Sequence, residues 1–187
     1  MMTENMHASS KDQMEKAHNE ILFLKDALNV DPQNSNNWAL LAANYAEVHD
    51  YQMAKKCYAS ALELDPAFDL IRFQLGLLQL CLAEVEASQH TWHPLEQLNE
   101  ADPLRMFVVG IQCLLRDQFS DALTWLEKGI AHNLHNHELN HDMRSMIERI
   151  KTIERNISSD AVKTVNESQG PEESMQHFLV SGYGKGH

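Results

Sequence analysis

One five-residue segment of the chain has the residue types and the spacing of a catalytic metal site. His137, Glu138 and His141 spell H-E-x-x-H, in which two imidazoles one helical turn apart bind zinc and the carboxylate activates water. A zinc-peptidase helix normally lies in an apolar setting and is followed by a third ligand, whereas the surrounding segment AHNLHNHELNHD is polar. We therefore treat His137 and His141 as weak metal candidates, keep a zinc metallopeptidase as the least favoured alternative, and expect no cofactor.

No other pattern in the sequence supports catalysis. There is no glycine-rich phosphate loop, no G-x-S-x-G segment and no cysteine–histidine pair in a catalytic context. We predict that the protein is not an enzyme, so that its function lies in its surfaces.

The composition excludes several classes of partner. A formal net charge of -12 repels phosphate backbones, and no cluster of Lys or Arg offers nucleic acid a basic stripe. The N-terminal residues lack the pattern of a secretory signal, and no run approaches the roughly 18 apolar residues that span a bilayer. We therefore expect a cytoplasmic protein without membrane contact. Cys57, Cys81 and Cys113 each fall within a helical pattern, which predicts reduced, buried thiols.

The strongest signal in the sequence is a repeat of about 34 residues. The first copy carries Trp38, Leu41, Ala42, Tyr45, Ala54, Tyr58, Ala61 and Pro66. The next two copies keep residues of similar size at many of these positions, including Leu75, Gly76, Ser88, Trp92 and Leu95, then Met106, Val109, Gly110, Cys113, Ala122, Leu126 and Gly129. Moving back by one period from Pro66 reaches Pro32, so half a copy precedes the first full one.

With only seven Gly and five Pro in 187 residues, the repeat predicts an all-α chain. The expected elements are a disordered N-terminus at 1–10, an opening helix at 11–29, helical hairpins at 35–68, 69–102 and 103–136, a capping helix at 138–155, and a flexible tail at 156–187. Asp102 and Pro103 are expected to cap and begin a helix, and Pro94 is expected to end or kink one.

The motif W-x2-L-A-x2-Y, followed by A-x3-Y, A and P, resembles the tetratricopeptide repeat. The resemblance implies a right-handed solenoid of antiparallel helix pairs whose concave face binds peptides or helices, and hence a scaffold or adaptor. The small size, the acidity and the three hairpins are also similar to the tetratricopeptide chaperones of type III secretion. A dedicated chaperone for a secreted protein is therefore the alternative function.

The first helices of the hairpins carry a second apolar face beyond the one that the repeat buries. We predict that this face forms a peptide-binding groove, small at the first hairpin and strongly apolar at the next two, for a protein or peptide with an apolar segment. Its residues are Ala39, Ala43, Leu70, Phe73, Leu77, Leu80, Leu104, Phe107, Ile111 and Leu114. The competing interpretation is that neighbouring helices or the chain's own tail bury these side chains.

The end of the chain turns apolar after a polar tether. Phe178, Leu179, Val180 and Tyr183 follow a stretch rich in Ser, Asn, Glu and Gly. We hypothesise that this segment docks in the apolar part of the groove, either in the same molecule or in a second copy, which would allow self-association.

Overall fold

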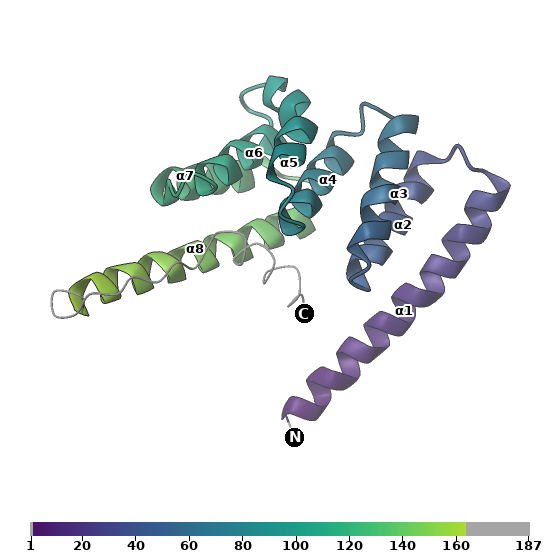
Figure 1. Ribbon diagram of the computed structural model, residues 1–187, viewed down its shortest axis with the longest axis horizontal. Helices are drawn as coiled ribbons and strands as arrows, with labels where there is room; N and C mark the ends of the chain where they lie inside the picture. Colours follow the sequence, from purple (N-terminus) through teal and green to yellow (C-terminus); the bar gives the residue numbers. More distant parts are fainter. Residues whose placement is uncertain (1, 164–187) are drawn as a thin grey trace. The chain divides into compact units, whose positions relative to one another are not determined.

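The structure is a computed structural model that describes the backbone of residues 2–163 and the side chains of residues 14–156. Every regular element in this range is helical (Figure 1). The elements are α1 (Met2–Val30), α2 (Ser35–Glu47), α3 (Tyr51–Leu64), α4 (Asp69–Cys81), α5 (Val85–Trp92), the 3-10 helix η1 (His93–Gln97), α6 (Pro103–Leu114), α7 (Phe119–His132) and α8 (His137–Lys163). In place of the single domain predicted over 11–155, the chain divides into two compact units, one before and one after the junction between Thr91 and Trp92.

The first unit opens with α1, which runs as one long helix (Figure 1). It begins at Met2, so the prediction that residues 1–10 are disordered and that the helix starts at 11 is wrong for the described residues. The physical reason is that no Gly or Pro interrupts the sequence before Pro32. At the other end of the described chain, α8 continues to Lys163, beyond the predicted end at 155.

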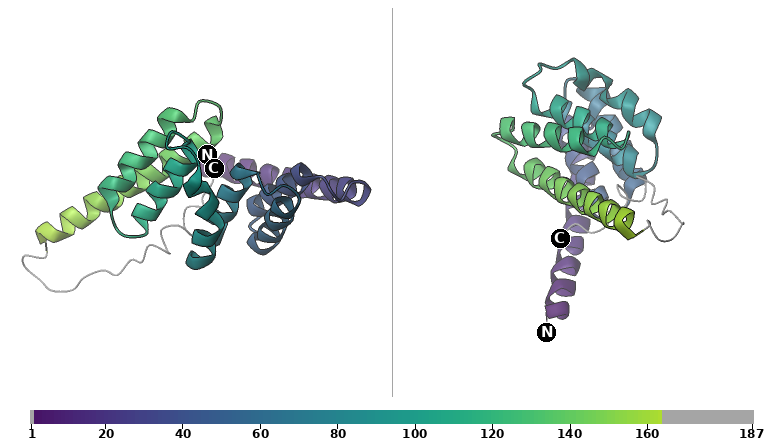
Figure 2. Two further views of the ribbon diagram at one scale, coloured as in Figure 1. Left: turned by 90° about the horizontal axis from the view of Figure 1, so that it is seen from above. Right: turned by 90° about the vertical axis from the view of Figure 1, so that its left-hand side faces the viewer.

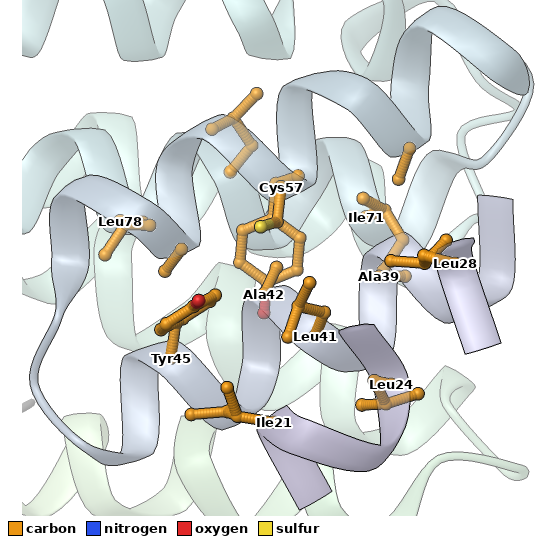
Figure 3. Close-up of a cluster of buried hydrophobic side chains, with 14 residues drawn as sticks. Ile21, Leu24, Leu28, Ala39, Leu41, Ala42, Tyr45, Cys57, Ile71 and Leu78 are labelled. Atoms are coloured by element: carbon orange, nitrogen blue, oxygen red, sulfur yellow. The ribbon is translucent and has the colours of Figure 1, made fainter. Parts of the chain in front are cut away.

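The core of the first unit lies where α1, α2, α3 and α4 meet (Figure 3). The helix α1 contributes a stripe at helical spacing that includes Ile21, Leu24 and Leu28. The small residues Ala42 and Ala54 are fully buried there, so α2 and α3 pack closely. The remaining core residues are Ala39, Leu41, Tyr45, Cys57, Tyr58, Ala61, Ile71, Leu75 and Leu78.

The backbone reproduces the period of the sequence. The turn inside each hairpin contains one residue in the left-handed region, namely His49 with φ 62°, Ala83 with φ 61° and Asp117 with φ 58°. Each turn is closed by an equivalent hydrogen bond from a backbone N–H to a backbone carbonyl. The three bonds join Asp50 to Tyr45 at 2.8 Å, Glu84 to Gln79 at 2.8 Å and Gln118 to Cys113 at 3.0 Å.

The period also survives at a position where the residue type changes. The indole Nε1 of Trp38 donates to the carbonyl of Pro32 at 2.9 Å, and one period later the Arg72 guanidinium donates to the carbonyl of Pro66 at 2.6 Å. Arg72 therefore keeps the hydrogen bond that the aromatic residue makes in the first hairpin. A charged side chain thus takes over the polar function of the tryptophan at the start of the repeat.

Two prolines determine where helices end or begin. The helix α5 stops at Trp92, and Pro94 lies in the first turn of η1, which confirms the predicted early end. In the second unit, the Asp102 side chain accepts a hydrogen bond from the N–H of Leu104, and Pro103 is the first residue of α6. The predicted cap is therefore confirmed.

Two glycines let α6 and α7 approach each other within the second unit. A Cβ atom on Gly110 would lie 3.0 Å from Cγ of Leu126 and 3.3 Å from the carbonyl oxygen of Ala122. A Cβ atom on Gly129 would overlap the ring of Phe107. The hairpin therefore depends on bare backbone at both points.

A buried pair of asparagines joins α7 to the long helix α8, which Figure 2 shows beside it in light green. The Asn133 amide donates to the side-chain oxygen of Asn140 at 2.9 Å, and the Asn140 amide donates to the Asn133 carbonyl at 2.7 Å. The Asn136 side chain caps the start of α8 by accepting from the N–H of Leu139. This network satisfies buried polar groups at the turn and fixes where α8 begins.

The left-handed turns predict a stabilising substitution. Ala83→Gly should raise the free energy of unfolding by about 1 kcal/mol, because a Cβ atom at positive φ costs roughly 1–2 kcal/mol and glycine avoids this cost. Ala43→Gly, the same change at an exposed position inside α2, should lower it by about 1 kcal/mol. Chemical denaturation measures both, and a loss of stability in Ala83→Gly would contradict the left-handed turn.

The glycine contact predicts the opposite result in the second unit. Gly129→Ala should lower the free energy of unfolding by about 1–3 kcal/mol, because its methyl group overlaps the Phe107 ring. Adding Phe107→Leu to that variant should cost less than Phe107→Leu costs in the wild type, since the two sites share one contact. Additive effects in this double-mutant cycle would show that the ring does not pack on Gly129.

Candidate interaction surface

The predicted groove residues differ in how far they are exposed. In α2, Ala39 is buried and Ala43 is exposed. In α4 and α6, Leu70 and Leu104 are half-buried. The other six, Phe73, Leu77, Leu80, Phe107, Ile111 and Leu114, are buried. The expectation that these six side chains line an open apolar patch is therefore wrong for this structure.

The reason lies in the composition of α4. Ile71, Leu75 and Leu78 on one side of this helix belong to the core of the first unit, while Phe73 and Leu80 on the opposite side are also buried. A helix with large apolar residues on two opposite sides is usually buried on both. Sequence periodicity finds the second apolar face but does not show what covers it.

Phe107 has a direct structural explanation in the second unit. Its side chain is fully buried, and its ring lies against Gly129 across the α6–α7 hairpin. It is therefore a core residue of that hairpin and not a contact residue for a partner.

Exposed large apolar side chains are instead concentrated on α1 and α2. Five of the six such residues among the described side chains are on these two helices, and the sixth, Leu134, lies in the turn between α7 and α8. The five are Met14, Leu22, Phe23, Val30 and Leu40. The repeat motif does not reveal them, because they lie outside the positions that the motif specifies.

One face of α2 forms a continuous exposed seam. Asn36, Leu40, Ala43 and Glu47 follow one another at steps of four, three and four residues, and all are exposed. Leu40 is 53% exposed at the centre of this seam. We call these four residues the α2 seam. It combines one large apolar side chain, one small residue and polar groups at both ends.

The H-E-x-x-H segment does not assemble a metal centre among the described residues. His137, Glu138 and His141 are exposed at the start of α8, where the buried residues are Leu139 and Asn140. In the part of the chain that the structure describes, no three His, Cys, Asp or Glu side chains are grouped to hold a metal ion. The geometry gives the zinc-peptidase alternative no support.

The three cysteines are buried thiols outside any disulfide, as predicted. Burial raises the pKa of the Cys57 thiol from 9.0 to about 11 and that of the neighbouring Tyr58 hydroxyl from 10.0 to about 12. Burial also raises the pKa of Cys113. A thiol with a raised pKa is a poor nucleophile, so these groups behave as core side chains.

The proposed docking segment at Phe178, Leu179, Val180 and Tyr183 lies outside the described residues. Within the described range, no helix has the length and apolar character to cross a membrane.

Helical hairpins that recur at a constant spacing, with equivalent turns and close helix contacts, define a tetratricopeptide-like helical-repeat protein. The fold is similar to two solved structures of MamA. One, "MamA RS-1 ArsTM double mutant", has a TM-score of 0.52 and 13% identity, and the match covers 88% of this chain and 97% of that one. The other, "MamA 41-end from Desulfovibrio magneticus RS-1", has a TM-score of 0.52 and 14% identity over 87% of this chain and 95% of that one.

At this identity the likeness concerns the fold alone. A scan against protein-family models gives no match, and a comparison with curated proteins gives no relative.

The raised pKa values predict how stability changes at alkaline pH. Because Cys57 ionises near 9 when unfolded and near 11 when folded, its contribution to stability is complete below pH 9 and is lost as the pH rises toward 11. We expect the free energy of unfolding to fall by roughly 1–3 kcal/mol over that interval. Denaturation at pH 8, 9.5 and 10.5 measures this, and Cys57→Ala should show a shallower decline. Equal slopes in the two proteins would contradict the assignment to Cys57.

Proposed function

We propose that this protein is a cytoplasmic scaffold that holds another polypeptide along the first helices of its repeats, with the α2 seam as the contact surface. The observation that carries the proposal is the exposure of Leu40 and Ala43 on a first helix whose opposite face is fully used by the core. A leucine in contact with water beside a small residue offers a partner a close apolar contact.

The strongly apolar part of the predicted groove is not assigned to the contact surface. Phe73, Leu77 and Ile111 are buried, so a partner reaches them only after local opening of the chain. Ala43 is the member of the predicted groove that is exposed, which is why we assign the contact to α2. The polar residues Asn36 and Glu47 at the two ends of the seam would fix the register of the bound segment.

A dedicated chaperone for a secreted protein would use the same surface. The two functions differ in what they retain, because a scaffold holds folded proteins in a stable assembly, whereas a chaperone holds one client that is unstable alone. The identity and the folding state of the retained protein therefore separate them.

The test is affinity purification of the wild-type chain and of Leu40→Glu from the source organism, with mass spectrometry of the retained proteins. Leu40→Glu should lose the specific partner and keep its melting temperature, because Leu40 is not part of the core. Leu134→Glu, which alters an exposed apolar residue in the second unit, is the matched control and should retain the partner. Identical recovery with the wild type and Leu40→Glu would refute binding at the seam.

A further inference from the structure

The helix α1 is equivalent to the second helix of a repeat. Its end, ALNVDP, corresponds to the end of α3, ALELDP, after a shift of one period. The hydrogen bonds agree: the N–H of Asp31 donates to the Ala27 carbonyl and the N–H of Asp65 to the Ala61 carbonyl, each at 2.9 Å. Asn133 makes the same bond to Gly129 at the end of α7, also at 2.9 Å. The end of α1 is therefore structurally equivalent to the ends of α3 and α7.

The contacts of α7 show which face of a second helix meets the first helix of its own hairpin. Gly129 lies against Phe107 of α6, and Ala122 lies against Gly110 of α6. The equivalent residues of α3, Ala54 and Ala61, are fully buried in the hairpin that α3 forms with α2. In α1 the same two positions are Glu20, which is exposed, and Ala27, which is half-buried.

Two large apolar side chains stand exposed on this same face of α1. Phe23 is 65% exposed and Val30 is 88% exposed, and they lie two helical turns apart on either side of Ala27. The equivalent of Phe23 in α3 is Cys57, which is buried in the core. We call Glu20, Phe23, Ala27 and Val30 the α1 outer face. The outermost helix of a repeat stack normally presents a polar surface, so this face has the character of an interior surface.

The chain's preceding residues do not cover this face as the first helix of a hairpin. They continue α1 as one helix from Met2, so no turn brings them back against Phe23 (Figure 1). A second copy is also disfavoured. In an antiparallel pair of α1 helices centred on Phe23, Glu20 of one copy would meet Asp26 of the other, and each chain carries a net charge of -12.

We propose that the α1 outer face binds an amphipathic helix of a partner protein, which takes the place that the first helix holds in the other hairpins. The bound helix runs antiparallel to α1, as α2 runs to α3, and has about the length of α2, α4 and α6, which are 13, 13 and 12 residues long. Lys or Arg flanks its apolar stripe, because Glu20 and Asp26 lie beside Phe23 and Asp31 follows Val30. The inference rests on the proposed scaffold function and adds a second contact surface to it.

The test uses two synthetic helical peptides of the same length as α2 and with the same Ala and Leu stripe, one flanked by Lys and Arg and the other by Glu. Fluorescence anisotropy against the full chain should show at least tenfold tighter binding of the basic peptide, with the preference falling as salt is added. Phe23→Glu should weaken that binding at least tenfold. Glu20→Lys combined with Asp26→Lys should shift the preference toward the acidic peptide.

Leu134→Glu is the matched control, because it changes an exposed leucine outside both the α1 outer face and the α2 seam. It should bind the basic peptide with wild-type affinity, and circular dichroism of every variant verifies that it is folded. No binding, equal binding of the two peptides, or unchanged binding by Phe23→Glu would overturn the proposal. So would a concentration-dependent dimer that Phe23→Glu dissolves, since the occupant would then be a second copy.

The two proposals fail separately. In one case the peptides do not bind, while the wild-type chain still retains a partner that Leu40→Glu loses. The proposal that a partner helix binds the α1 outer face is then wrong, and the scaffold function stands. If no partner is retained at the α2 seam but the basic peptide binds at Phe23, the contact surface belongs to α1 and the assignment to α2 is wrong.

Discussion

The close approach of two helices inside each hairpin is the constraint on which the rest of the structure depends. In the second unit this approach requires bare backbone at Gly110 and Gly129, and in the first unit it is made by the fully buried Ala42 and Ala54. Helices that approach so closely need a short turn of fixed geometry, which explains why three different residue types adopt the same left-handed conformation. The larger core residues then fill the space that this spacing leaves.

Much of the fold was predictable because local rules determine it. The repeat period, the cap at Asp102 and the interruption at Pro94 each have a cause that can be read in the sequence itself. The start of α1 was not predictable in this way, since a helix without Gly, Pro or a capping signal has no locally defined beginning. Arg72 shows a related limit, because its hydrogen bond to Pro66 could not be foreseen from residue type.

The candidate surface was harder to predict than the fold. Amphipathic spacing correctly placed Phe73 and Phe107 on a second apolar helix face. Spacing alone does not distinguish a face that is buried within the chain from an exposed face that binds a partner. The exposed residue Phe23 would have been found by extending the repeat alignment to the position before Leu24. In a repeat protein, a large apolar residue at an interior position of an incomplete repeat is the signal to examine.

The order in which the helices pack also bears on how the chain is made. Within the first unit, α1 contacts α2, α2 contacts α3 and α3 contacts α4, so neighbours in sequence are neighbours in space. A chain of this kind can fold progressively as it leaves the ribosome, because each new hairpin finds its packing surface already formed and closes only short loops. The helix α1 is synthesised before α2 and gains its buried side only when α2 has emerged.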